Sequence, residues 1–243
     1  MTVVEHLSEL RRRLFISLAS VGVASILGFV FYNQILSFLT GPYCKAVAAL
    51  PPENRPEGFT TCKLVYSSPV DPFLTLIKVA FFSGLMIALP VVLWQVWRFV
   101  TPALRKRQQR LGVWFVLVSM LLFAGGGAFA LAIIPRGLTF LLGLGNESLV
   151  PLLTVDRYLG FLIFLILSFG ISFEFPLAMI FLAGARVVSS AQMRRFRRYV
   201  YLGIAVFAAV ATPTQDPYTM LLMTGPLIGF YEAAILVARL LKR

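Results

Sequence analysis

The stretch YLGFLIFLILSFGISFEFPLAMIFLAGA, residues Tyr158–Ala185, is a long apolar run in which Glu174 is the single ionisable residue. Arg157 precedes the run and Arg186 follows it, so 28 residues lie between the two charges. At about 1.5 Å of rise per residue, a helix of this length crosses a hydrocarbon core about 30 Å thick with some tilt. Pro176 removes a backbone donor and predicts a kink beside Glu174. The stretch therefore predicts a transmembrane helix with a carboxyl group inside the hydrocarbon.

The carboxyl group of Glu174 needs an explanation at this depth, because placing it there costs at least about 2.5 kcal/mol on insertion scales. Such a group is normally kept protonated, or it faces water or a partner. Two interpretations follow from the run alone. Glu174 is either a protonated side chain that bonds a neighbouring helix, or a functional polar point of a membrane protein.

The composition places the whole chain in the same class. It has 243 residues, of which 59% are hydrophobic and 13% charged, whereas soluble domains are about 45–50% apolar and about 25% charged. The first apolar run, Leu14–Leu39, is longer than the roughly 7–15 residues of a cleaved signal-peptide core, so we expect a retained span. We attribute the net charge of +12 to membrane topology rather than to nucleic acid.

Six spans are expected, preceded by a short amphipathic helix over residues 1–13. They are about Leu14–Leu39, Pro72–Val100, Leu111–Ile134, Tyr158–Ala185, Tyr199–Ala211 and Tyr218–Ala238. Polar segments at Gly41–Pro69, Pro135–Asp156 and Arg186–Arg198 are expected to be loops. Inside the third span, the Gly125–Gly127 run predicts close approach of another helix.

The fifth run has only 13 residues, about 20 Å of helix against a core of about 30 Å. Either the helix begins earlier and draws Arg194–Arg198 towards the headgroups, or the bilayer thins beside it.

The basic residues predict the orientation in the membrane. Six spans place both termini on one side, and only six of the 22 basic residues then fall on the other side, which leaves 16 on the side of the termini. This excess predicts a multi-pass protein of the cell membrane with both termini in the cytoplasm. We expect one membrane domain over residues 1–243, with a first extracytoplasmic loop at 40–71 and a cytoplasmic tail at 239–243.

The chain lacks the usual signals of an enzyme. It has one histidine, His6, and two cysteines, and no phosphate-binding loop of the GxxxxGK[ST] kind. We therefore expect no cofactor, no metal site, no catalytic residue and no nucleic-acid partner. In an oxidising compartment Cys44 and Cys62, which share one proline-rich segment, predict a disulfide, with two free thiols as the alternative.

Three charged residues repeat at helical spacing near the amino terminus: Glu5, Glu9 and Arg13. One interpretation is a solvated helix with a local Glu9–Arg13 ion pair. The other is that Glu9 offers its carboxylate to a basic ligand at the membrane surface.

Four motifs together resemble the TatC family, the signal-peptide receptors of the twin-arginine protein translocase. They are HLSELRRRL at 6–14, PVVLWQVWRFVTPAL at 90–104, FGISFEFP at 169–176 and TPTQDP at 212–217. The resemblance implies an all-α, concave, glove-like bundle of six transmembrane helices with short helices 5 and 6. It implies a non-enzymatic receptor that binds twin-arginine signal peptides at its cytoplasmic face and exports folded proteins with the proton-motive force. The cysteine pair resembles that of actinobacterial members.

The resemblance also implies a signal-peptide site. The family's amino-terminal glutamate matches Glu9, with Arg11 and Arg13 beside it, and a functionally important aromatic matches Phe99. A second family glutamate is replaced here by Gln108, which accepts hydrogen bonds but brings no charge. We therefore expect weaker binding of the arginine pair or a compensating carboxylate, for which Glu5 is the candidate.

Further family positions match Pro42 in the first outside loop, the buried Glu174 and Asp216 in the last outside turn. Implied partners are the single-span proteins TatA and TatB near spans 5 and 6, the signal peptides of folded cargo, the lipid bilayer and further copies of the chain. We expect Glu174 to be largely protonated at rest. The alternative function is an ion-coupled secondary transporter with Glu174 as the ion site, which would move a small solute when reconstituted alone.

Overall fold

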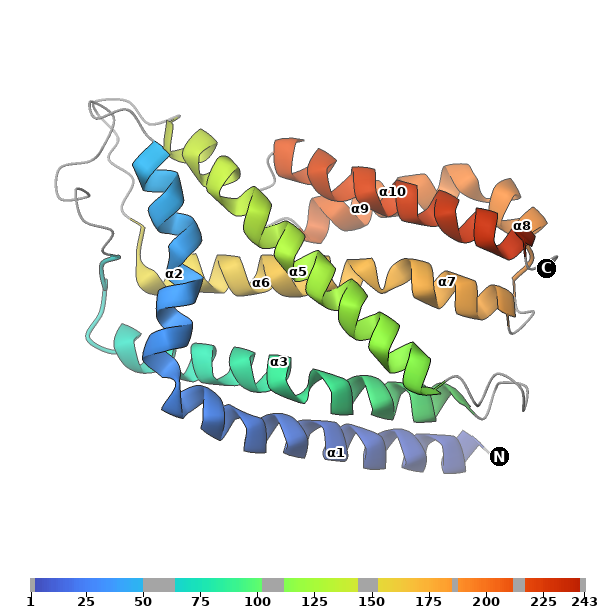
Figure 1. Cartoon of the computed structure of the whole chain (residues 1–243), viewed down its shortest axis with the longest axis horizontal. Coiled ribbons are helices and arrows are strands. Elements are labelled where there is room, and N and C mark those ends of the chain that lie inside the picture. Colours follow the sequence, from blue (N-terminus) through green and yellow to red (C-terminus); the bar gives the residue numbers. More distant parts are fainter. Residues whose placement is uncertain are drawn as a thin grey trace. The chain divides into compact units, whose positions relative to one another are not determined.

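The computed structural model describes residues 3–49, 64–101, 112–143, 153–184, 188–211 and 217–240, and these residues are almost entirely helical (Figure 1). In chain order the helices are α1 (Val3–Val30), α2 (Tyr32–Ala49), α3 (Asp71–Val100), α5 (Gly112–Gly143), α6 (Val155–Phe173), α7 (Phe175–Gly184), α8 (Ser190–Arg195), α9 (Arg197–Ala211) and α10 (Pro217–Leu240). Within those ranges the β-structure is one isolated bridge between Val65 and Thr154. The expected all-α class is confirmed.

Five segments of the described chain are long and apolar enough to cross a membrane. They are Val4–Val30, Asp71–Val100, Gly112–Thr139, Val155–Ala183 and Met223–Leu240. The fifth expected span corresponds to α9, whose 15 residues make about 22 Å of helix. By contrast, α10 has 24 residues, about 36 Å of helix. Two helices were expected to be short, and of these α9 is too short for the hydrocarbon core.

The chain forms two compact units, and the boundaries between them fall inside α3, α5 and α6. The first unit comprises residues 1–92 and 128–166, and the second comprises residues 93–127 and 167–243.

Small residues bring α1 and α3 together in the first unit. A Cβ atom added to Gly28 would lie 1.9 Å from Ser83 Oγ, and one added to Gly84 would lie 2.6 Å from the backbone nitrogen of Ser25. Buried Val21, Ala24 and Ala88 form the adjoining core. Close backbone approach through small side chains is the usual packing of membrane helices.

The first apolar run forms two helices, which corrects the prediction of one span over Leu14–Leu39. The first helix ends at Val30, and α2 leaves it at a steep angle (Figure 1). Tertiary contacts hold α2 in place: the Tyr158 hydroxyl donates to the Leu39 carbonyl at 2.8 Å, and the rings of Tyr43 and Tyr158 lie 5.6 Å apart. Since α2 runs to Ala49, the start of the segment expected to be a loop is helical.

The third span also exceeds its predicted end at Ile134. Helix α5 passes through Pro135 and continues to Gly143. Leu138 is buried on the same face as Ile134, and the Thr139 hydroxyl lies 2.8 Å from the Pro135 carbonyl and 3.2 Å from the Ala46 carbonyl. These contacts with the first unit's own residues explain why the proline does not end the helix.

In the second unit, glycines again set the closest helix contact. A Cβ atom on Gly126 of α5 would lie 2.5 Å from the Phe169 carbonyl oxygen of α6, whereas one on Gly125 would meet its nearest neighbour at 3.9 Å. The predicted close approach at Gly125–Gly127 is therefore confirmed, with Gly126 as the contact residue.

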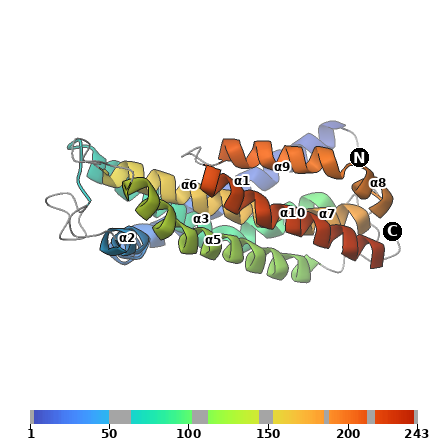
Figure 2. The same cartoon turned by 90° about the horizontal axis from the view of Figure 1, so that it is seen from above.

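The segment expected to be a loop before the fifth span contains α8, whose first turn is closed by a capping box between Ser189 and Gln192. Helix α9 then begins at Arg197, two residues earlier than expected, while Arg194 and Arg195 belong to α8. Helices α9 and α10 lie side by side in both views (Figures 1 and 2).

Candidate functional site

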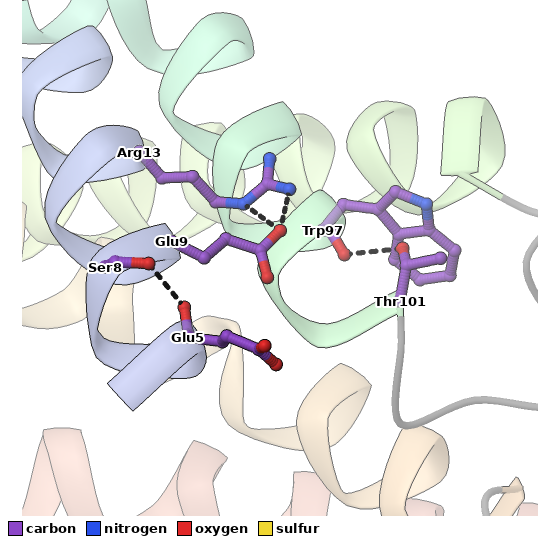
Figure 3. Close-up of polar contacts among 6 residues, drawn as sticks. All are labelled: Glu5, Ser8, Glu9, Arg13, Trp97 and Thr101. Atoms are coloured by element: carbon purple, nitrogen blue, oxygen red, sulfur yellow. Dashed lines mark hydrogen bonds and ion pairs between the residues drawn. The ribbon is translucent and has the colours of Figure 1, made fainter. Parts of the chain in front are cut away.

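The carboxylate of Glu9 lies near the amino-terminal end of α1 and pairs with Arg13, one turn further along the helix. Arg13 Nε lies 3.1 Å from Glu9 Oε1, and Nη2 of the same guanidinium bonds the same oxygen (Figure 3). The i,i+4 spacing places both groups on one helix face. The expected local ion pair is confirmed.

This pair sits in a basic, exposed turn. Arg11 and Arg12 are exposed, whereas the side chains of Glu9 and Arg13 keep only 19% and 15% of their exposure. The Ser8 hydroxyl donates to the Glu5 carbonyl at 2.8 Å (Figure 3). Because both bonds from Arg13 converge on Oε1, a second guanidinium that binds Glu9 must share this oxygen or use Oε2. The arrangement thus holds the Glu9 carboxylate in a fixed, partly buried position near the start of α1.

The end of α3, in the second unit, carries the second group of candidate residues. Trp97 is buried, and its ring lies 4.7 Å from that of Phe115 and 5.0 Å from that of Phe181. Phe99 is half-buried on the same turn. The Thr101 hydroxyl donates to the Trp97 carbonyl at 2.7 Å (Figure 3). The aromatic cluster fixes this helix end and thereby the position of Phe99.

Glu174 occupies the break between α6 and α7. Its backbone N–H donates to the Ile171 carbonyl at 3.1 Å, a one-turn contact tighter than an α-helix makes, and its carbonyl accepts from Ala178 at 3.0 Å. Pro176 lies in the first turn of α7, where its missing N–H is tolerated. The helix is thus interrupted at Glu174, beside the proline that predicted a kink.

The Glu174 side chain is half-buried and lines an apolar cavity of about 540 Å³ between α6, α7, α9 and α10. Its polar neighbour on α5 is the buried hydroxyl of Ser119. The other lining residues are Ile171, Ser172, Phe175, Ala178, Met179, Val200, Gly203, Ile204, Phe207 and Leu227. Glu174 is thus the acidic point of an apolar wall.

The remaining predicted residues are distributed elsewhere. Pro42 is buried within α2, and Cys44 of the same helix is disulfide-bonded. Gln108, Asp216 and Cys62 lie outside the described residues, so their predicted roles stay predictions.

Sequence reasoning missed two ion pairs that join distant segments. Lys78 of α3 pairs with Asp156 of α6 in the first unit, and Arg197 of α9 pairs with Glu232 of α10 in the second. Glu232 also accepts a hydrogen bond from the Tyr201 hydroxyl. An acid inside the last span was visible in the sequence, but five arginines between residues 186 and 198 were equivalent candidates for its partner.

The fold and these residues together define a multi-pass α-helical membrane protein with an amino-terminal carboxylate site and a polar point in an apolar wall. The family model of the Sec-independent protein translocase protein (TatC) matches residues 5–226.

Named relatives agree with this match. The chain is 38% identical over 247 residues to the Sec-independent protein translocase protein TatC of Frankia casuarinae, covering all of this chain and 67% of that protein. It is 37% identical over 246 residues to TatC of Aquifex aeolicus, covering all of this chain and 97% of that protein. A crystal structure described as the twin-arginine translocase receptor TatC superposes with a TM-score of 0.79 at 36% identity, over 98% of this chain and all of the other.

The chain belongs to the TatC family. It is a protein translocase subunit and not an enzyme.

Proposed function

We propose that this chain is the signal-peptide receptor and core subunit of a twin-arginine translocase. The observation that carries the proposal is the Glu9 carboxylate, held in place by Arg13 at the basic amino-terminal end of α1. A similar solved protein, at a TM-score of 0.79, is described as a twin-arginine translocase receptor. Guanidinium groups prefer bidentate carboxylate partners, and lowered dielectric at the interface strengthens such bonds.

The other predicted site residues take supporting roles in this proposal. Arg11 and Arg13 flank the carboxylate, and Phe99 offers an aromatic surface for the residues next to the arginine pair. Gln108 accepts hydrogen bonds in place of a second carboxylate. We expect its missing charge to weaken binding, with Glu5 as the compensating acid.

The orientation and partners follow from the charge pattern and the family. With 16 of 22 basic residues on the side of the termini, both termini lie in the cytoplasm of a plasma membrane. TatA and TatB helices pack near α9 and α10, and further copies of the chain associate. Folded cargo moves with the proton-motive force. Glu174, protonated at rest, gives the apolar wall a polar contact for a helix or signal segment.

A photo-crosslinking experiment tests the receptor site. A photoreactive residue at Leu10, which is exposed beside Glu9, is combined with a signal peptide carrying Arg-Arg or Lys-Lys. Crosslinking should be strong for Arg-Arg and at least tenfold weaker for Lys-Lys. Glu9→Gln should abolish this preference, whereas Arg12→Gln, an exposed charge change on the same helix, should keep it. Equal crosslinking of both peptides would reject the site.

The missing carboxylate is tested in the same assay. Gln108→Glu should strengthen crosslinking to Arg-Arg, and Glu5→Gln should weaken it if Glu5 compensates.

The transporter alternative is not favoured by the family. Flux of a small solute through vesicles that contain this chain alone would revive it, and Glu174 variants would then be assayed for flux.

A further inference from the structure

The junction of α8 and α9 combines an apolar pocket with a cluster of arginines. The pocket has a volume of about 280 Å³ and is lined by Met179, Val188, Gln192, Met193, Phe196, Val200 and Tyr231. Gln192 and Phe196 are exposed, so the pocket opens to the surface beside them. Two of its lining residues are joined directly, because the buried Tyr231 hydroxyl donates to the Met193 carbonyl at 2.8 Å.

Four arginines adjoin the lining residues along the chain: Arg194, Arg195, Arg197 and Arg198. Their surroundings differ. Arg197 is engaged by Glu232, and Arg198 donates to the Tyr199 hydroxyl at 3.0 Å and stacks over its ring. Arg194 and Arg195 are exposed on the last turn of α8, and no hydrogen bond or ion pair joins their side chains to other described residues. Two exposed guanidinium groups thus lie, along the chain, between the lining residues Met193 and Phe196.

The depth of this junction in the membrane supports a lipid as the occupant. Because α9 makes only about 22 Å of helix, its first residue lies close to the level of the headgroups once the rest of α9 occupies the hydrocarbon. A basic cluster at headgroup level next to an apolar pocket matches a phospholipid, whose phosphate and acyl chain are joined in one molecule.

We infer that the α8–α9 junction is a binding site for an anionic phospholipid. The headgroup phosphate contacts Arg194 and Arg195, and the first part of one acyl chain enters the pocket beside Val200. The site shares no residue with the proposed signal-peptide site, so the inference does not depend on the proposed receptor function.

Native mass spectrometry of the full chain in detergent tests the site, with phosphatidylglycerol and phosphatidylcholine as probes. The wild type should retain phosphatidylglycerol about tenfold more tightly than phosphatidylcholine. The double variant Arg194→Gln/Arg195→Gln should lose this preference. The matched control Arg136→Gln/Arg157→Gln removes two other exposed arginines and should keep it. Equal retention of phosphatidylglycerol by the two double variants would overturn the inference.

The pocket is tested separately. Val188 lines this pocket and not the cavity at Glu174, so Val188→Phe and the larger Val188→Trp fill it, and both should weaken phosphatidylglycerol binding while the chain stays folded by circular dichroism. Retention unchanged in a folded Val188→Phe protein would show that no acyl chain occupies the pocket. Inorganic phosphate at millimolar concentration should not displace the lipid, and displacement would replace the lipid site with a phosphate site.

Discussion

Glu232 accepts a charged hydrogen bond from Arg197 and a second bond from the Tyr201 hydroxyl, so one carboxylate links two turns of α9 to α10. The side chains of Arg197 and Glu232 keep 43% and 32% of their exposure. Solvent therefore screens the pair in part, and its net contribution is smaller than that of a fully buried pair. Arg197 Nε, by contrast, is buried with no partner among the described residues.

Removing the Glu232 carboxylate should destabilise the protein. Glu232→Leu leaves the Arg197 guanidinium half-buried without its acid, and we expect a loss of about 1–2 kcal/mol in the free energy of unfolding. Adding Arg197→Met should recover part of this loss, and Tyr201→Phe alone should cost less. Unfolding in detergent micelles measures all four proteins. A double variant no more stable than the single one would contradict the coupling.

Glu174 differs from Glu232 because its neighbour is a neutral hydroxyl, that of Ser119, and its cavity is otherwise apolar. Glu174→Gln keeps a polar group of similar size and removes titration, whereas Glu174→Leu removes both. We expect export of a twin-arginine reporter protein to fall further in the leucine variant. Equal loss in both variants would show that export requires the charge itself.

At the scale of elements, α5 and α6 meet where a side chain has no room. Gly126→Ala would place a methyl group 2.5 Å from the Phe169 carbonyl oxygen, so the helices must separate. We expect a loss of about 1–3 kcal/mol in the free energy of unfolding. Gly125→Ala is the matched control, because its methyl group meets only Phe173 at 3.9 Å, and better helix propensity should make it neutral or stabilising. Equal stability of the two variants would show that the contact is not tight.

The same scale separates what the sequence predicted from what it did not. The break at Glu174 was predictable because Pro176 acts locally, within one turn. The break at Phe31 has no proline within one turn to mark it. A contact that holds α2 beyond this break comes from Tyr158, 119 positions from its acceptor Leu39. At Pro135 the sequence predicted a helix end that the structure does not have. Helix α5 continues past this proline, and Thr139 beyond it contacts Ala46, which is distant in sequence.

The ion pairs show the same difference between local contacts, which the sequence predicts, and distant contacts, which it does not. The Glu9–Arg13 pair was predictable because i,i+4 spacing fixes it within one helix. The pair between Arg197 and Glu232 spans 35 positions, and helical spacing cannot choose one arginine among several for such a partner. An ion pair within one helix could therefore be predicted from the sequence, whereas an ion pair between helices required the structure.

For the molecule as a whole, the unequal lengths of the helices must be reconciled with one bilayer. Helix α3 has 30 residues and α9 only 15, about 45 Å and about 22 Å of helix. A long helix adapts by tilting or by extending into the headgroups, whereas a short one requires local thinning or charged residues that reach outward. The arginines at the start of α9 are charged residues that can reach outward in this way.

Bilayer thickness should therefore affect this protein through α9. We expect the chain to unfold at a higher denaturant concentration in short-chain than in long-chain phosphatidylcholine vesicles, because a thin bilayer leaves less apolar length unmatched beside α9. Arg198→Leu extends the apolar surface of that helix at an exposed position and should shift the optimum towards thicker bilayers. Arg157→Leu changes the same kind of charge at the start of α6, a helix long enough to span with α7, and should leave the optimum unchanged. An optimum in thick bilayers for the unsubstituted chain would mean that the long helices, and not α9, set the match between this protein and its membrane.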